Sequence, residues 1–184
     1  MAVLSGKTIV LGVSGSVAAY KAAEIARRLI EAGAQVTAVL TAGAQRFITP
    51  LTFTAITGRP ALTDAFSLPE GAMPHLELAK GATAVLVAPA SANILARLSG
   101  GQADDLLTSI CLVTRAPVFL APAMHEPMWT NPATRRNVET LKGFGHRFLG
   151  PETGALASGD QGLGRLLETG TLVEELVRAL APQR

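Results

Sequence analysis

The chain has 184 residues, of which 48% are hydrophobic and 16% are charged, and its formal net charge is +2. This length and composition predict a single domain, residues 1–184, with its own core, and exclude a disordered chain. The small charge, the lack of a Lys/Arg run and an aromatic content of 4% argue against nucleic-acid binding. The single cysteine, Cys111, excludes a disulfide scaffold and a cysteine-rich zinc site, and no metal site is predicted.

No apolar run approaches the roughly 18 residues that a membrane span requires. The N-terminal sequence MAVLSGKTIVLG lacks the basic region and long apolar stretch of a signal peptide. We therefore expect a cytoplasmic protein with no membrane partner.

Apolar runs and helical stretches alternate along the chain. Thr8–Val13 predicts a strand, and Val17–Glu31 predicts an amphipathic helix that ends before Gly33. The remaining elements are strands at Val36–Leu40, Ala84–Ala88, Val118–Ala121 and His146–Leu149, and helical segments at Leu76–Lys80 and Leu172–Leu180. Because the strands are apolar on both faces, the pattern predicts an α/β fold, a doubly wound parallel sheet covered by helices.

Two stretches interrupt this pattern. Residues 117–132 contain four prolines, and residues 150–164 contain five glycines, so we predict loops in both places. Each follows a predicted strand. The loops should therefore lie at the carboxyl edge of the sheet, where folds of this class bind their ligands.

The turn Gly12–Ser16 joins the first strand to the first helix. Free N–H groups at such a turn attract an anion, and the hydroxyls of Ser14 and Ser16 add hydrogen-bond donors. The turn lacks the full dinucleotide pattern, and Thr41 follows the second strand where an acidic residue would hold a ribose. The choice at this point lies between a mononucleotide phosphate site and an ordinary turn.

Other polar residues are ambiguous by themselves. Ser91 and Asn93 could contact a ligand or cap a helix, and Asp104-Asp105 more naturally begins a helix than binds metal. Among the histidines, His75 and His125 could each serve as a base or lie at the surface, whereas His146 is expected to be structural or solvated.

Two further features concern apolar residues. Cys111 lies in the apolar run SICLV and is predicted to be a buried small hydrophobe rather than a nucleophile. Met124, Met128 and Trp129 could form part of the core or a flat wall for a ring system.

Together, the motifs resemble the flavin-dependent cysteine decarboxylase family over nearly the whole chain. They are, in order, GVSGSVAAYKA (12–22), FITPLTF (47–53), PHLELAK (74–80), APASANILARLSGGQADDLLT (88–108), APAMHEPMWTNPAT (121–134) and GALASGDQGLGRL (154–166). The resemblance implies a flavodoxin-like (Rossmann-type) sheet that binds FMN. The expected activity is decarboxylation of 4'-phosphopantothenoyl-L-cysteine to 4'-phosphopantetheine in coenzyme A biosynthesis.

The resemblance also assigns roles to residues. It implies that FMN is bound by Gly15, Ser16, Val17, Thr41, Phe47, Ser91, Ala92, Asn93, Ile94 and Ala123. It implies that His75 is the active-site histidine and that Lys21, Lys80, His125 and Met128 lie near the substrate. Residues 150–166 correspond to the family's flap. The family assembles as trimers or dodecamers, and in many bacteria this part is fused to the synthetase that makes its substrate.

Two positions depart from the family pattern. His125 stands where the family has Asn, which would make carboxylate recognition pH-dependent, and Ser158 stands at the flap position that often holds an acidic cysteine. A hydroxyl is a far weaker acid than a thiol, whose pKa is about 8.5. Two alternatives therefore remain open: a peptidyl-cysteine oxidative decarboxylase that stops at a C-terminal enethiol, and a non-catalytic FMN-binding regulator.

Overall fold

The computed structural model describes residues 3–65, 73–157 and 159–181. Five parallel strands form one sheet in the order β2-β1-β3-β4-β5, with β1 (Thr8–Val13), β2 (Gln35–Leu40), β3 (Ala84–Ala90), β4 (Val118–Pro122) and β5 (Arg147–Phe148). A separate antiparallel hairpin consists of β6 (Glu152–Ala155) and β7 (Gln161–Arg165). The prediction of a flavodoxin-like doubly wound α/β sheet is confirmed.

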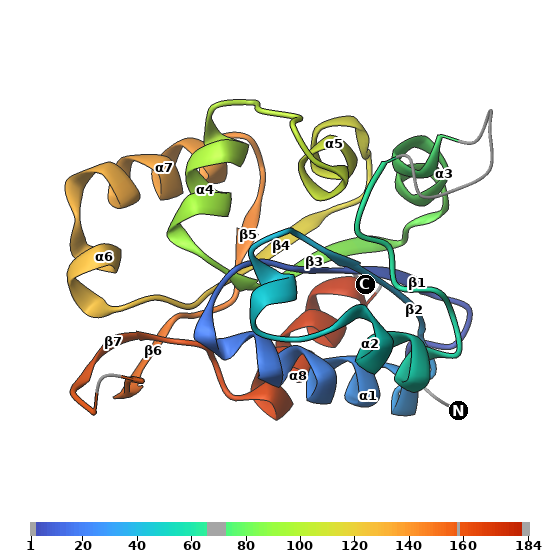
Figure 1. The fold of residues 1–184 in the computed structure, drawn as a ribbon, viewed down its shortest axis with the longest axis horizontal. Coiled ribbons are helices and arrows are strands. Elements are labelled where there is room, and N and C mark those ends of the chain that lie inside the picture. The colour runs from blue at the N-terminus through green and yellow to red at the C-terminus, as the bar shows by residue number, and fades with distance from the viewer. Residues whose placement is uncertain (1–2, 66–72, 158, 182–184) are drawn as a thin grey trace.

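Helices cover both faces of the sheet (Figure 1). One face carries α1 (Lys21–Glu31), α2 (Pro50–Thr57) and α8 (Thr169–Leu180), and the other carries α3 (Pro74–Gly81), α4 (Ala92–Ser99), α5 (Leu106–Val113) and α7 (Pro132–Gly143). Two 3-10 turns, η1 (Val17–Tyr20) and η2 (Ala44–Arg46), follow β1 and β2, and α6 (Glu126–Thr130) follows β4. None of the helices that the structure describes is long and apolar enough to cross a membrane.

The alternation of side chains along each strand divides the core into two layers. In β3, Leu86 belongs to the cluster that contains the α1 side chains, and its neighbours Val85 and Val87 belong to the cluster beneath α4 and α5. All three are fully buried. This two-sided burial explains why the strands contain no polar alternation.

Several predicted boundaries need correction. The first α-helix begins at Lys21, because residues 17–20 form the 3-10 turn η1, and the last begins at Thr169. The strand predicted at Val118–Ala121 is confirmed as β4, but the loop predicted around it contains the short helix α6. Pro127 at the second position of α6 does not interrupt the helix, because the first turn of a helix needs no N–H there. The stretch 150–164 is also more regular than predicted, since most of it forms the hairpin β6–β7.

Candidate functional site

The strand order changes direction between β1 and β3, so the crevice for a ligand lies between the segments that follow these strands. Ser14 connects these segments. Its Oγ donates to the carbonyl oxygen of Pro89 at 2.7 Å and accepts from the N–H of Ser91 at 2.9 Å. Because Ser14 is buried and its hydroxyl serves both bonds, it stabilises the floor of the crevice.

A second close approach joins the segments after β1 and β2. A Cβ added at Gly15 would lie 3.2 Å from backbone atoms of Gly43, and one added at Gly43 would lie 3.3 Å from Cα of Gly15. Thr41 supports this turn by accepting the N–H of Ala44 on its Oγ1 at 3.2 Å. The lack of side chains at both glycines brings the two backbones together and leaves their outer side open to a ligand.

The first turn of α4 faces the same crevice. Ser91 caps this helix, with its Oγ accepting the N–H of Ile94 at 3.3 Å. The N–H groups of Ala92 and Asn93 precede any intrahelical acceptor, so they are donors at the positive end of the helix dipole. This end of the crevice is suited to a phosphate.

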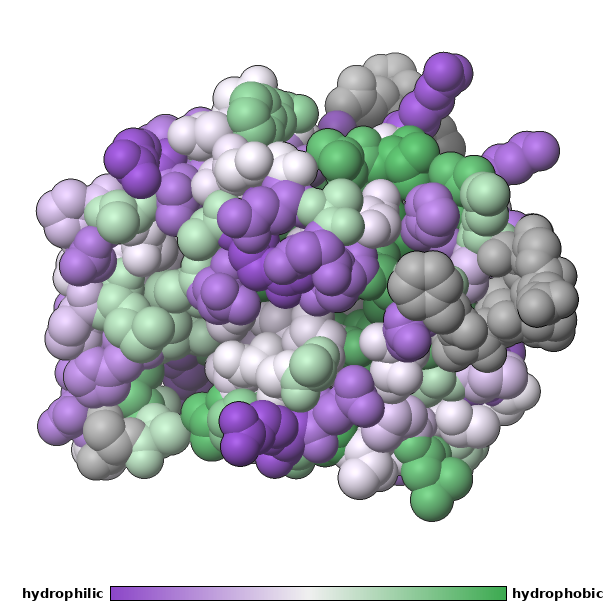
Figure 2. All heavy atoms as spheres, turned by 45° about the horizontal axis from the view of Figure 1, so that its top comes forward, coloured by the Kyte–Doolittle hydropathy of each residue, from purple (hydrophilic) through white to green (hydrophobic). Residues whose placement is uncertain are grey.

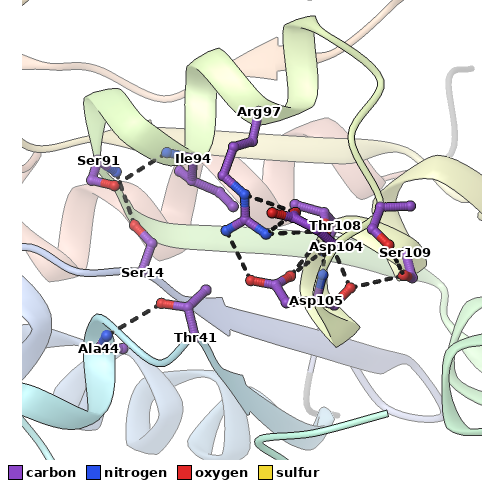
Figure 3. A network of polar contacts seen from close by, with 11 residues as sticks. Ser14, Thr41, Ala44, Ser91, Ile94, Arg97, Asp104, Asp105, Thr108 and Ser109 are labelled. Carbon is purple, nitrogen blue, oxygen red and sulfur yellow. Dashed lines mark hydrogen bonds and ion pairs between the residues drawn. The ribbon is translucent and has the colours of Figure 1, made fainter.

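A cavity of about 590 Å³ opens above these segments. It is lined by Ser14, Gly15, Thr41, Ala42, Gly43, Ser91, Asn93, Ile94, Arg97, Gln102, Asp104 and Asp105. Figure 3 shows Arg97 directed at Asp104 and Asp105, with an Nη1–Oδ2 distance of 2.9 Å to Asp105. The hydrogen bond from Arg97 holds the pKa of the Asp104 carboxyl below its ordinary value. One guanidinium thus faces two carboxylates, and the cluster keeps a net negative charge.

Asp105 has a second role as the N-cap of α5. Its carboxylate accepts the N–H of Thr108 at 2.9 Å, and the Thr108 hydroxyl accepts the N–H of Asp105 at 3.2 Å. We expect Asp105→Ala to lower the free energy of unfolding by about 1–2 kcal/mol, because a capped N–H group loses its partner. Asp104→Ala, at an exposed neighbour that caps no helix, is the control in urea denaturation. Equal losses in both variants would contradict the capping role.

A second cavity of about 490 Å³ lies on the other side of the segment 14–16. It is lined by Ser16, Val17, Ala18, Tyr20, Lys21, Ala123, Met124, His125, Ala155, Leu156, Ala157, Gly164, Arg165 and Leu166. The Ser16 hydroxyl closes its base by donating to the carbonyl oxygen of Ala123 at 3.1 Å. The lining is mainly apolar, with positively charged Lys21 and Arg165 near the hairpin.

The hairpin packs directly on the segment after β4. The N–H of Met124 donates to the carbonyl oxygen of Gly164 at 2.9 Å, and a Cβ at Gly164 would lie 2.2 Å from the carbonyl oxygen of Met124. Gly164 also has φ +148°, a conformation that favours glycine. Only glycine at this position allows the hairpin to form one wall of the second cavity.

The two cavities contain most of the predicted site residues. Of the predicted FMN residues, Gly15, Thr41, Ser91, Asn93 and Ile94 line the larger cavity, and Ser16, Val17 and Ala123 line the smaller one with the predicted substrate residues Lys21 and His125. Phe47, Ala92 and Met128 do not line either cavity; Phe47 and Met128 are about half exposed. Ser158 lies outside the described residues.

His75 and Lys80 lie elsewhere in this chain. Both are on α3, at the end of the molecule opposite the hairpin (Figure 1), and neither lines the two cavities above. Lys80 lines a separate hollow between α3 and α5, together with Arg115. The fold of one chain therefore does not bring the predicted active-site histidine to the predicted cofactor residues.

The sequence patterns did not identify several cavity residues. Gly43 has a recognisable signal, a glycine just after a strand. Arg97 and Gln102 have none, because each lies on or after a helix with an ordinary amphipathic pattern. Their place at the cavity depends on how α4 and α5 pack.

The structure shows where the residues lie whose roles the sequence left open. Trp129 is buried in the core, beneath the Arg135 guanidinium 5.2 Å from its ring centroid, while Met128 is half exposed, so they form no common wall. His146 is half-buried, and burial lowers the pKa of its imidazole. No cluster of three or more His, Cys, Asp or Glu side chains suited to a metal ion occurs in the described part of the chain.

Cys111 is buried in α5, as predicted, and burial raises the pKa of its thiol to about 12. We expect the native protein to resist a thiol-specific reagent at pH 8, because the thiolate that reacts is scarce and inaccessible. Unfolding in denaturant should expose one thiol per chain. Rapid labelling of the native protein would contradict this assignment.

The geometry fits a flavin mononucleotide. The α4 N–H groups and the open Gly15–Gly43 turn suit a phosphate, and the apolar wall near Ala123 and Leu166 suits a flat ring. Both cavities lie in the range of about 300–1,000 Å³ that is typical of ligand pockets. The residues present therefore fit the group that the sequence motifs predict.

Comparison with known proteins defines the class. The model of the family described as Flavoprotein matches residues 2–181. The chain therefore belongs to the flavoprotein family.

Two curated relatives show what the chain is similar to within this family. The chain is 51% identical over 175 residues to the coenzyme A biosynthesis bifunctional protein CoaBC of Vibrio parahaemolyticus, and 46% identical over 181 residues to that of Escherichia coli K12. These matches cover 94% and 97% of the chain but only 44% of each relative. The chain thus spans less than half the length of the curated relatives that it matches.

Solved structures agree with this similarity. A cysteine-to-serine mutant of PPC decarboxylase, complexed with pantothenoylaminoethenethiol, has a TM-score of 0.83 at 34% identity, covering 94% of this chain and 97% of that one. The FMN-dependent cysteine decarboxylase SpaF has a TM-score of 0.80 at 29% identity, covering 94% of this chain and 99% of that one.

Proposed function

We propose that the chain is an FMN-dependent decarboxylase that converts 4'-phosphopantothenoyl-L-cysteine to 4'-phosphopantetheine in coenzyme A biosynthesis. The observation that carries this proposal is the pair of cavities that meet at Ser14–Ser16, at the β1–β3 crevice. One is lined by predicted cofactor residues, and the other adds predicted substrate residues. The similarity to CoaBC proteins and to PPC decarboxylase supports the same activity.

A cofactor is needed because a cysteine carboxylate has no adjacent group that can accept the electrons of the breaking C–C bond. Bound FMN would supply a two-electron acceptor for the substrate thiol. The chain's own residues would bind and orient the substrate: His125 would hold the carboxylate, and Lys21, only 16% exposed, would bring positive charge to the same cavity. His125→Ala should weaken substrate binding and retain FMN, which kinetics and flavin absorbance can measure.

To act at the proposed site, His75 must come from a second copy of the chain, because it lines neither cavity of its own chain. It lies on α3 beside an apolar surface, which we name the α3–α5 patch and which consists of the exposed residues Met73, Leu76, Leu112 and Val113. Figure 2 shows hydrophobic residues gathered on this face. A second apolar surface, the η1–α2 patch, consists of Val17, Tyr20, Phe47 and Leu51 and borders the smaller cavity.

Because the two patches are different surfaces, a contact between them joins identical chains head to tail. Repetition of such a contact can close into a ring such as a trimer. Contact between the α3–α5 patch of one copy and the η1–α2 patch of the next would bring His75 of the partner subunit to the smaller cavity. We therefore propose a homo-oligomer, a trimer or a dodecamer, with the cofactor site at the subunit contact.

The test begins with the colour of the purified protein and the mass of its product. We expect a yellow protein whose flavin absorbance is that of FMN, and a product that has lost carbon dioxide alone. A colourless protein that refuses added FMN would refute the proposal. Loss of carbon dioxide together with two hydrogens, from a peptide with a C-terminal cysteine but not from the phosphorylated substrate, would favour the peptidyl-cysteine alternative.

Bound FMN without turnover of either substrate would favour a regulator. The CoaBC relatives also suggest that a phosphopantothenoylcysteine synthetase acts beside this chain, fused or separate, and we propose a cytoplasmic location on the same basis.

A further inference from the structure

The smaller cavity contains few groups that can deliver a proton. Among its described lining residues, Tyr20, Lys21, His125 and Arg165 carry titratable side chains. Imidazole is the side chain whose titration normally falls between pH 5 and 8, whereas phenol, ammonium and guanidinium groups keep their protons there. Among these side chains, the imidazole of His125 is the type that most often serves as a general acid or base in enzymes.

The backbone of His125 is held firmly at the N-cap of α6. Its carbonyl oxygen accepts the N–H groups of Met128 at 2.9 Å and Trp129 at 3.1 Å. The imidazole points to the hairpin turn, where its Nε2 lies 3.4 Å from Oδ2 of Asp160. The contact joins the segment after β4 to the hairpin, so a proton donor lies at the boundary between these two walls of the cavity.

Other charges surround the imidazole. Lys21 on α1 is paired with Glu168 at 3.4 Å, and Arg165 on β7 is paired with Glu152 at 3.3 Å and with Glu168. Glu126, the residue after His125, packs against the hairpin at Gly162. The cationic side chains of Lys21 and Arg165 are thus engaged by carboxylates.

We propose that His125 is a catalytic acid that protonates the substrate carbon from which the carboxylate has left, with Asp160 as a positioning residue for its imidazole. This inference rests on the proposed function. A group that contacts the carboxylate lies next to the carbon that bears it. Because His125 lines the cavity, its imidazole would lie near the carbon that takes up the proton after carbon dioxide departs.

The electrons and atoms of this reaction balance. Bound FMN would supply the two-electron acceptor for the thiol, which would lose a hydride from Cβ and a proton from sulfur. The resulting thioaldehyde loses carbon dioxide, and the electron pair of the broken C–C bond forms an enethiolate. His125 donates a proton to Cα, where the electron pair forms a C–H bond. The hydride then returns to Cβ and a proton binds to sulfur, which gives the thiol. In the net reaction one proton replaces one carboxylate.

The decisive variant is His125→Asn, because an amide donates a hydrogen bond to a carboxylate but transfers no proton at neutral pH. In air, where dissolved dioxygen reoxidises the reduced flavin, we expect carbon dioxide release to continue while the product changes from thiol to enethiol, with thiol formation at least about 100-fold slower, the typical contribution of a positioned acid. His146→Asn, at the start of β5, is the matched control and should leave the product unchanged.

The binding of a substrate analogue distinguishes acid catalysis by His125 from a purely structural role of this residue. An unreactive substrate analogue with a methyl group in place of the thiol should bind His125→Asn with nearly wild-type affinity in calorimetry, and thiol formation in that variant should lose its dependence on pH between 5 and 8. If Asn at this position disturbs the fold, seen as a lower melting temperature, His125→Gln replaces it in the same assays.

Two results would overturn the proposal and leave the decarboxylase function intact: unchanged thiol formation in His125→Asn and His125→Gln, or release of enethiol by the wild-type protein. Failure of the wild-type protein to release carbon dioxide would instead refute the proposed function.

Discussion

A His75→Asn protein is expected to remain yellow and to release carbon dioxide at least about 100-fold more slowly than the wild-type protein. FMN should stay bound because His75 lines neither cavity of its own chain. Asn has a similar size and keeps a hydrogen-bond donor, but it cannot exchange a proton near neutral pH. Carbon dioxide release and flavin absorbance, measured on the same preparation, test both expectations.

Two comparisons make this experiment specific. His146→Asn removes another imidazole, one that lies at the opposite end of β5 from the hairpin, and should be fully active. Full activity of His75→Asn would reject the catalytic assignment of His75. Loss of FMN from this variant would mean that His75 supports the cofactor rather than the reaction.

Gly15→Val should produce the second large effect, the loss of FMN binding. The added side chain would be forced against the backbone of Gly43, which is 3.2 Å from the position of a Cβ. Overpacking of this kind costs about 1–3 kcal/mol, so FMN affinity should fall by about 5- to 150-fold. Fluorescence titration of the flavin-free protein measures this loss, and Gly143→Val, where the structure leaves open space around the added Cβ, is the matched control.

Mixed oligomers of the two variants test whether His75 acts across a subunit contact. The His75→Asn chain keeps an intact FMN site, and the Gly15→Val chain keeps His75. If the chains mix at random in a head-to-tail ring, about a quarter of the sites receive an intact half from each, and activity should recover to about that fraction. If the mixture is as inactive as each variant alone, the proposal that two subunits form one site is contradicted.

The core of the fold was predictable because burial on both faces leaves a clear signal. After Thr8, the run to Val13 has no polar side chain, and the helix that ends before Gly33 buries Ala22, Ile25 and Leu29 on one face. The hairpin was missed because glycines carry no side-chain pattern: the run from Gly154 to Gly164 indicates a loop locally. Its pairing and its contact with Met124 form only when the chain folds back.

Within the site, the place of the turns that follow strands could be predicted from position alone, whereas the roles of their residues came from the family resemblance. Gly15, Thr41 and Ser91 each follow a parallel strand, and the carboxyl ends of such strands meet at one edge. The roles of their hydroxyls could not be predicted. Ser14 connects two strand ends rather than facing a ligand, because its partners at Pro89 and Ser91 are distant in the chain.

By itself, the sequence determined which segments are buried, where ligand-binding turns occur and which chemical family the motifs resemble, because these properties are local. Only the tertiary structure decided that the predicted residues divide between two cavities, that Asp160 contacts His125, and that His75 lies on a different surface from both cavities. Such relations depend on how α3 and the hairpin pack against the sheet, and packing joins residues that are far apart in the chain.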